Sequence, residues 1–230
     1  MSVSPIAAMF NRISPKYDFL NHLFSMNIDK VWRRKTAKAV AKTHLKTILD
    51  LATGTADLAI ALAKRNSQAH IIGMDISEKM LEIGKEKVQK LALESQIDLR
   101  IGDAAALPFK DHSFDAVTVA FGVRNFEDLQ QGLSEICRVL KPNGMVFILE
   151  FSMPEMFPIK QLYRLYFKHL LPTVGKMVSK DASAYTYLPE SVERFPRPDV
   201  FIQILEETRL KNGVAKQLSF GIATLYTASK

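Results

Sequence analysis

The chain has 230 residues, 47% hydrophobic and 24% charged, which suits one globular domain with a full core and excludes a largely disordered protein. The formal net charge of +7 suits acidic partners such as nucleic acid or an anionic membrane surface, but does not determine the fold. The single cysteine, Cys137, excludes an internal disulfide, and no secretory signal or membrane-spanning apolar run is apparent. We therefore expect a cytoplasmic protein.

Strand and helix patterns alternate regularly over the first two thirds of the chain. In chain order we expect a basic helix over 31–45, a strand over 47–51, a helix over 57–65, a strand over 70–74, a helix from an N-cap at Ser77 to 93, strands over 97–101 and 114–121, a helix over 127–140 and a strand over 145–151. Lys141-Pro142-Asn143-Gly144 is expected to end the last of these helices. Such alternation indicates βαβ crossovers and a parallel sheet.

The pattern changes after Phe151. Residues 152–197 are rich in proline and aromatic residues and are expected to form helices over the ligand edge of the sheet. A helix over 199–208 and two strands over 214–220 and 222–228 follow, and the short connection at Gly221 makes these strands antiparallel. An α/β open sheet of Rossmann type that ends in an antiparallel hairpin resembles the class I S-adenosylmethionine-dependent methyltransferases.

We therefore expect a single methyltransferase domain over 1–230. Its parts are an N-terminal helical cap (1–45), a cofactor-binding core (46–151), a helical insertion over the site (152–197) and a C-terminal helix with a hairpin (198–230).

The candidate cofactor residues follow the first three strands. The turn after the first strand contains one glycine, Gly54, whereas a dinucleotide site needs three, so a ligand without a pyrophosphate is favoured. Thr55 can offer a backbone N–H or hydroxyl group to the methionine part of S-adenosylmethionine. Asp75, which ends the second strand, can accept both ribose hydroxyls. Asp103 and Ala104, after the third strand, can bind adenine through a carboxylate and a backbone N–H.

Several neighbouring residues have equally good structural explanations. Asp75 alone would be a solvated residue at a strand end, and only the ordered series favours a ligand role. Asp50 and Asp57 can serve as turn or helix-capping residues as readily as ligand contacts. Cys137 is expected in the core. The basic run Arg33-Arg34-Lys35 with Lys38 and Lys42 is typical of a solvated helix face, with contact to a membrane surface as the alternative.

Several segments together resemble the menaquinone/ubiquinone biosynthesis C-methyltransferases, the UbiE family. They are Tyr17-Asp18-Phe19-Leu20-Asn21, Ser25-Met26-Asn27, Trp32-Arg33, Asp103 to Phe109, Phe121-Gly122-Val123-Arg124-Asn125, Arg138 to Gly144, His169-Leu170-Leu171-Pro172 and Asp181 to Leu188. The chain departs from the family pattern at Ala56, where glycine is common, and at Asn27-Ile28-Asp29-Lys30, which replaces Gly-x-His-Arg. Alanine at position 56 points weakly to the menaquinone branch.

The resemblance implies methyl transfer from S-adenosylmethionine to a ring carbon of a demethylated polyprenyl quinol, demethylmenaquinol to menaquinol, without a metal. It also implies catalytic roles for Arg124, which would stabilise a phenolate, for Asn125, which would bond the same oxygen, and for Tyr17, which would close over the site. Each residue also has a purely structural explanation: an ion pair for Arg124, a turn for Asn125 and core packing for Tyr17. His169 is a candidate base, although a lone histidine among leucines is more often packed.

The remaining expectations concern partners. The aromatic stripe Tyr163, Tyr166 and Phe167 is typical of a core and can alternatively line a groove for the isoprenoid tail. A quinol dissolved in lipid favours peripheral contact of the protein with the inner membrane face. The sequence does not determine whether the protein forms a homo-oligomer. No nucleic-acid partner is expected, because the sequence lacks the cysteine-proline and Asp/Asn-Pro-Pro-aromatic patterns of nucleic-acid methyltransferases. A benzoquinol C-methyltransferase, a small-molecule O- or N-methyltransferase, a nicotinamide dehydrogenase and a non-catalytic binding protein are rival functions for such a chain.

Overall fold

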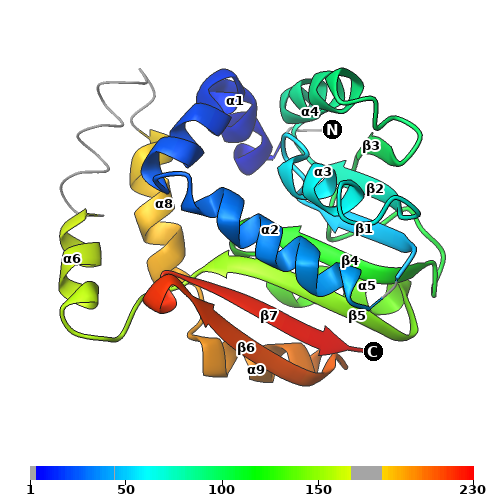
Figure 1. Ribbon diagram of the computed structural model, residues 1–230. Helices are drawn as coiled ribbons and strands as arrows, with labels where there is room; N and C mark the ends of the chain where they lie inside the picture. Colours follow the sequence, from blue (N-terminus) through cyan, green and yellow to red (C-terminus); the bar gives the residue numbers. More distant parts are fainter. Residues whose placement is uncertain (1–3, 44, 167–182) are drawn as a thin grey trace.

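The computed structural model describes residues 4–43, 45–166 and 183–230 (Figure 1). The helices are α1 (Pro5–Phe24), α2 (Ile28–Ala41), α3 (Asp57–Ala63), α4 (Glu78–Lys90), α5 (Leu129–Val139), α6 (Ile159–Leu165), α8 (Ser183–Arg194) and α9 (Pro198–Glu207), with 3-10 turns η1 (Val123–Asn125) and η3 (Ser219–Gly221). The strands are β1 (Thr47–Leu51), β2 (His70–Asp75), β3 (Ile97–Ile101), β4 (Phe114–Ala120), β5 (Leu140–Phe151), β6 (Lys211–Leu218) and β7 (Ala223–Ser229).

The strands form one seven-stranded sheet in the order β3-β2-β1-β4-β5-β7-β6. The first five strands are parallel, and β7 pairs antiparallel with both β5 and β6. The predicted open parallel sheet with a C-terminal antiparallel hairpin is therefore confirmed. Since β2 and β3 lie on one side of β1 and β4 on the other, the strand order reverses between β1 and β4, where sheets of this kind bind ligands.

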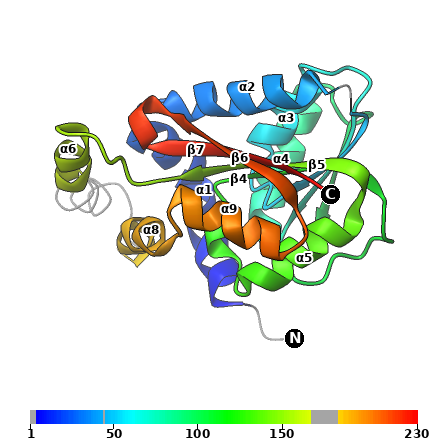
Figure 2. The same ribbon diagram turned by 90° about the horizontal axis from the view of Figure 1, so that it is seen from below.

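Helices cover both faces of the sheet, with α2 and α3 on one side and α5 and α9 on the other, as Figure 2 shows edge-on. Ile48 packs in a cluster with α2, α3 and α4, whereas its neighbour Leu49 packs in a second cluster with α5 and α9. The sheet thus has two covered faces, which explains the continuous apolar run in β4. The predicted burial of Cys137 is confirmed in the second cluster, and the predicted N-cap at Ser77 is confirmed by its hydrogen bond from the Met80 amide.

The structure differs from the predicted elements mainly at three places. Helix α1, within the expected N-terminal helical cap, spans Pro5–Phe24, and α2 begins at Ile28 instead of residue 31. Strand β5 begins at Leu140 because the Lys141–Gly144 turn is accommodated as an irregularity in the β4–β5 ladder, with Asn143 at a φ of 63°. A short 3-10 turn, η3, joins β6 and β7.

The carboxyl ends of β1 and β4 approach each other closely. The chain turns after β1 through Gly54, whose φ of 55° suits glycine. A side chain at Gly122, just after β4, would collide with the methyl group of Ala52 in this turn. The glycine of the Phe121-Gly122-Val123 segment therefore allows the two loops that flank the ligand edge to lie against each other.

Candidate active site

A cavity lies at the carboxyl ends of β1, β2, β3 and β4, covered by α1. We call it the strand-edge cavity, and its lining includes the expected residues Gly54, Asp75, Asp103, Ala104, Tyr17 and Asn125. Thr55 is buried and lines a small polar extension instead, which shares Tyr17, Ala52, Gly54 and Ala120 with the strand-edge cavity. The fold thus brings all the candidate cofactor residues together around two adjoining pockets.

The Asp75 carboxylate is held by backbone groups. Its two oxygens accept hydrogen bonds from the Gly54 amide (2.8 Å) and the Ser77 amide (2.8 Å). Burial raises the pKa of Asp75, and these amide donors oppose that shift. Each carboxylate oxygen can accept a further bond, so a ligand diol in the cavity would meet an acceptor that is already fixed in orientation.

The polar extension contains groups of both charge signs. Asp50 lines it from the end of β1 and accepts hydrogen bonds from the hydroxyls of Thr53 (2.6 Å) and Thr118 (2.5 Å). Burial raises the pKa of Asp50 to about 6, although both threonine hydroxyls and Arg33 favour the ionised form. Arg33 lies in the same wall as Asp50. One small ligand could therefore pair its ammonium group with Asp50 and its carboxylate with Arg33 in this extension.

Arg33 departs from the expected solvated basic face. Its side chain is buried, forms an ion pair with Asp29 and lies over the ring of Phe121, 5.1 Å from the centroid. Its neighbours Arg34 and Lys35 are exposed as expected. The signal that could have identified Arg33 is its place beside Trp32 on the apolar stripe of the helix, one turn after Asp29.

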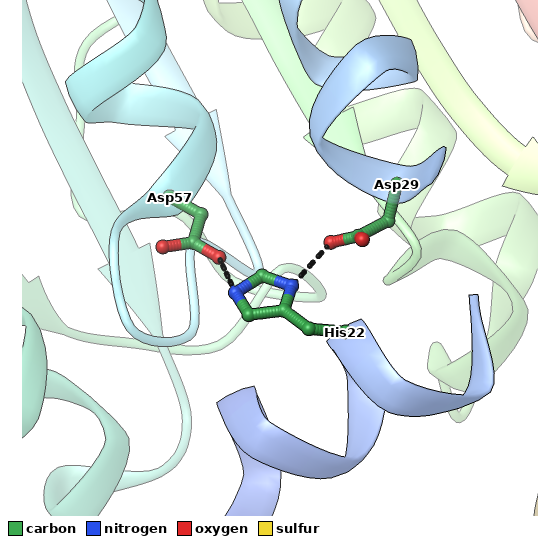
Figure 3. A group of neighbouring side chains, drawn as sticks. All are labelled: His22, Asp29 and Asp57. Carbon is green, nitrogen blue, oxygen red and sulfur yellow. Dashed lines mark hydrogen bonds and ion pairs between the residues drawn. The ribbon is translucent and has the colours of Figure 1, made fainter. Parts of the chain in front are cut away.

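Beside the extension, His22 lies between Asp29 and Asp57 (Figure 3). Its Nδ1 is 2.9 Å from Asp29, and its Nε2 is 3.9 Å from Asp57. Three such groups can hold a metal ion, but Arg33 already pairs with Asp29 and Lys87 with Asp57 (2.7 Å). Burial would raise the pKa values of both carboxyl groups, and these cations lower them. We interpret the group as a charge network that joins α1, α2 and α3.

The same network fastens α1 over the strand-edge cavity. Lys87 of α4 forms an ion pair with Asp18 of α1 (2.6 Å), and the Thr55 hydroxyl donates to the same carboxylate (2.6 Å). Further along α1, the Asn11 Oδ1 accepts from the Ser77 hydroxyl (2.8 Å) at the start of α4. These contacts hold the helix that contributes Tyr17 to the cavity. No role for Lys87 or Asn11 was predicted from the sequence, because only the fold brings α4 to α1.

Tyr17 and Asn125 line the cavity from two segments that are far apart in the sequence, helix α1 and turn η1. Burial raises the pKa of Tyr17, so its hydroxyl stays protonated and can donate. Asn125 lies in η1, and its Oδ1 accepts a hydrogen bond from the Tyr187 hydroxyl (2.8 Å). The Asn125 amide nitrogen is then the group left to donate elsewhere. Tyr187 belongs to a segment that carried the family resemblance, but no role of its own was predicted for it.

Arg124 forms the ion pair that was the alternative to a substrate contact. Its Nη1 donates to Glu150 (2.6 Å) and to the Phe121 carbonyl (2.6 Å), and its guanidinium lies over the Phe151 ring. The Arg124 amide also donates to Glu150 (3.3 Å). Arg124 lines a different pocket, between η1 and α8. Glu150, at the end of the neighbouring strand, is fully buried and competes with any substrate oxygen for this guanidinium.

A second cavity, the apolar cavity, lies between the α1–α2 turn, the end of β5, α6 and α8. Its lining carries no charged side chain among the residues described here and consists of Asn21, Ser25, Met26, Ile28, Trp32, Phe151, Ile159, Leu162, Tyr163, Tyr166, Leu188 and Ile222. Two members of the predicted aromatic stripe, Tyr163 and Tyr166, therefore face this space, whereas Phe167 and the candidate base His169 lie outside the described residues.

Three aromatic rings separate the two cavities. Phe121 lines the strand-edge cavity, Phe151 and Trp32 line the apolar cavity, and the Phe121 and Phe151 centroids are 4.4 Å apart. The centroid of the Trp32 ring lies 6.1 Å from that of Phe121 and 6.0 Å from that of Phe151. A polar ligand on one side and an apolar ligand on the other would thus be neighbours across a thin aromatic wall.

Comparison with known proteins gives a consistent result. A model of the ubiE/COQ5 methyltransferase family matches residues 2–230. The chain is 45% identical to a demethylmenaquinone methyltransferase of Bacteroides fragilis over 225 residues, which are 98% of this chain and 92% of that protein. It is also 45% identical to a ubiquinone/menaquinone biosynthesis C-methyltransferase UbiE of Geotalea daltonii, with 98% and 96% covered. A SAM-dependent methyltransferase structure from Aquifex aeolicus shares the fold, with a TM-score of 0.65, 19% identity and coverage of 92% and 97%.

Proposed function

The chain belongs to the ubiE/COQ5 methyltransferase family, and we propose that it transfers a methyl group from S-adenosylmethionine to a ring carbon of demethylmenaquinol, giving menaquinol. One observation carries the proposal: a cavity with fixed carboxylates at the strand ends adjoins a cavity without charged lining among the described residues, across the wall of Trp32, Phe121 and Phe151. The two relatives' names, which concern menaquinone and ubiquinone methylation, support the same substrate class.

The polar groups that line the strand-edge cavity suit the polar groups of S-adenosylmethionine. We assign Asp75 to the ribose hydroxyls, Asp103 and the Ala104 amide to adenine, and Gly54 with Thr55 to the methionine part. A Cβ on Gly54 would meet nothing within 4 Å, so a ligand can approach this backbone closely. When bound, S-adenosylmethionine supplies an electrophilic methyl group.

The side chains of the protein orient and activate the quinol. A reduced quinol has the electron density at its ring carbon that methylation requires, and it gains more as a hydroxyl proton passes to solvent. As the ring carbon takes the methyl group, S-adenosylhomocysteine would leave, and the ring then loses the proton of that carbon to solvent and becomes aromatic again. We propose that the Tyr17 hydroxyl and the Asn125 amide nitrogen donate hydrogen bonds to the substrate oxygen, which stabilises the developing phenolate. The apolar cavity receives the tail, and we propose that the side chains of the aromatic wall move apart to admit the quinol ring to the strand-edge cavity, because methyl transfer requires the ring carbon to contact the methyl group.

For Arg124 the geometry supports positioning. Its guanidinium bonds the Phe121 carbonyl and Glu150, so it fixes the end of β4 and the η1 turn that carries Asn125. We propose that Arg124 acts on the substrate oxygen through Asn125, and that contact of Arg124 with the phenolate itself requires the Glu150 ion pair to open.

We further propose that the enzyme works in the cytoplasm in contact with a membrane, where a polyprenyl quinol resides. Among the described residues, no helix combines the length and the apolar character needed to cross a bilayer. The contact would therefore be peripheral.

The function is tested by methyl transfer from labelled S-adenosylmethionine to a short-tailed demethylmenaquinol. Transfer is expected only while the substrate is kept reduced, because an oxidised quinone ring is electron-poor. The product should carry the new methyl on carbon. A matched demethylated benzoquinol, a catechol and RNA serve as the comparison substrates. Turnover of the oxidised quinone, or methyl transfer to a catechol oxygen at a similar rate, would exclude the proposed reaction.

The cofactor assignment is tested by Asp75→Ala. We expect the affinity for S-adenosylhomocysteine to fall by about 1.5–3 kcal/mol, because hydrogen bonds to a charged acceptor are lost. Isothermal titration calorimetry measures the change, and Asp98→Ala, an exposed carboxylate on the adjacent strand β3, is the control. Unchanged affinity in a folded Asp75→Ala protein would remove Asp75 from the cofactor site.

A further inference from the structure

Large apolar side chains that face solvent occur in the segments that line the apolar cavity. Met26, in the α1–α2 turn, and Leu162, in α6, line the cavity and yet are 73% and 61% exposed. In α6 and the segment just before it, Met156, Phe157 and Leu165 are also exposed, and Phe157 reaches 79%. We call these five residues the apolar rim. Several exposed apolar side chains in segments that line one cavity mark an interaction site more often than isolated exposed residues do.

The position of the rim suits a flat partner. Helix α6 stands at one end of the molecule, away from the sheet and from the helices that cover it, in both views (Figures 1 and 2). The rim residues come from α6, the segment that leads into it and the α1–α2 turn. A planar surface can therefore touch the rim without reaching the strand-edge cavity.

The charges around the rim favour an anionic partner. Helix α6 contains Lys160 and Arg164 and no acidic residue, and Lys30 is exposed in the first turn of α2. Glu155, the acidic residue that precedes the rim segment, forms an exposed ion pair with Arg197 (3.3 Å). Basic groups beside apolar side chains are typical of proteins that insert into the headgroup region of a membrane with anionic lipids.

We propose that the apolar rim docks the protein on an anionic lipid bilayer, so that the apolar cavity opens directly into the lipid. This inference rests on the proposed function, because a polyprenyl quinol then moves from the bilayer into the cavity without crossing water. The basic run Arg33-Arg34-Lys35 with Lys38 and Lys42, a candidate for membrane contact on sequence grounds, contributes none of the residues named for this surface.

The test is flotation of the full chain with vesicles of phosphatidylcholine and phosphatidylglycerol in equal parts, in the absence of substrate. The protein is expected to float with these vesicles, less with phosphatidylcholine alone, and less at high salt. Phe157→Ser with Leu165→Ser removes two rim residues that do not line the cavity, and vesicle binding should fall at least about tenfold. Leu91→Ser with Val214→Ser is the matched control, since both are exposed apolar residues elsewhere.

The catalytic arm separates this proposal from the proposed function. The rim variant should lose activity toward vesicle-embedded quinol and keep activity toward a soluble, short-tailed quinol. If the parent protein does not float, if the rim variant floats as well as the control, or if the rim instead joins two copies of the chain in solution, the membrane proposal is wrong. If the parent floats but methylates no quinol, the docking surface stands and the proposed function fails.

Discussion

Replacing Glu150 with alanine is expected to lower the free energy of unfolding by about 3–5 kcal/mol, because it leaves the buried Arg124 guanidinium without its carboxylate partner. The Arg124 and Glu150 side chains are 7% and 0% exposed, and their charged atoms lie 2.6 Å apart. Glu150 also accepts hydrogen bonds from the backbone amides of Arg124 and Phe151. Without the carboxylate, Arg124 keeps only the Phe121 carbonyl and the Ser191 hydroxyl as polar partners among the contacts described.

The chain provides a matched control for this prediction. Arg194 and Glu190 form an ion pair of the same length, 2.6 Å, but their side chains are 72% and 57% exposed. Glu190→Ala should therefore cost less than about 1 kcal/mol, because water solvates and screens both charges. Chemical denaturation of the two variants gives the comparison. Similar losses in both would show that the Arg124–Glu150 pair is not shielded from water.

A double variant separates the structural from the catalytic role of Arg124. Arg124→Met with Glu150→Leu replaces the ion pair by apolar side chains of similar size, which often restores stability. If Arg124 acts by positioning Asn125, the double variant should lose kcat by the same factor at low and high pH, because the bond from the guanidinium to the Phe121 carbonyl is missing at both. If the kcat deficit of the stable double variant shrinks at high pH, where more of the quinol ionises unaided, and cofactor affinity is unchanged, the guanidinium contacts the substrate oxygen, as the family resemblance implied.

The sheet and the carboxylates at its edge were predictable because local patterns determine them. Alternation of apolar runs and turns placed Asp75 and Asp103 after successive strands, and parallel strands bring such ends to one edge. Arg33 was not predicted, since a basic run on a helix is solvated on most faces and only its place beside Trp32 marks it as buried. Sequence patterns indicate which face of a helix or strand is buried more readily than they indicate which segment packs against that face.

Contacts between distant segments could not be predicted from local patterns. Glu150 is 26 positions from Arg124, and nothing local indicates that β4 and β5 bring the two together. The apolar cavity likewise combines Trp32 of α2, Phe151 of β5 and Ile222, which lies between η3 and β7. The aromatic stripe was recognised, but only the fold shows that Tyr163 and Tyr166 line the apolar cavity.

Asp50→Asn is expected to stabilise the protein without ligand and to weaken cofactor binding. Burial raises the pKa of Asp50 from 3.8 to about 6, so the folded state favours the neutral carboxyl more than the unfolded state does. The stability that this preference provides is fully present below pH 3.8 and is lost as the pH rises through about 6. Above that pH the ionised carboxylate costs about 3 kcal/mol, which asparagine avoids.

The sign of this effect is checked by its dependence on pH. The difference in free energy of unfolding between Asp50→Asn and the parent should reach about 3 kcal/mol at pH 8 and about half of that at pH 5. Altered hydrogen bonds to Thr53 and Thr118 add an offset that does not change with pH. Urea denaturation at the two pH values measures the difference. A difference that is equal at both would show that Asp50 does not titrate between them.

The Asp50 carboxylate destabilises the protein without ligand, and its presence is explained if it binds the ammonium group of the cofactor. Asp50 and Arg33 line the polar extension, so we expect them to pair with the ammonium and carboxylate of the methionine part. S-adenosylhomocysteine has these groups and 5′-methylthioadenosine lacks them, whereas both carry the ribose that we assign to Asp75. The ratio of the two affinities therefore isolates the polar extension. In the parent this ratio should rise between pH 5 and 8, and in Asp50→Asn it should be flat and about tenfold lower at pH 8. A ratio that the substitution leaves unchanged would place the ammonium group away from Asp50.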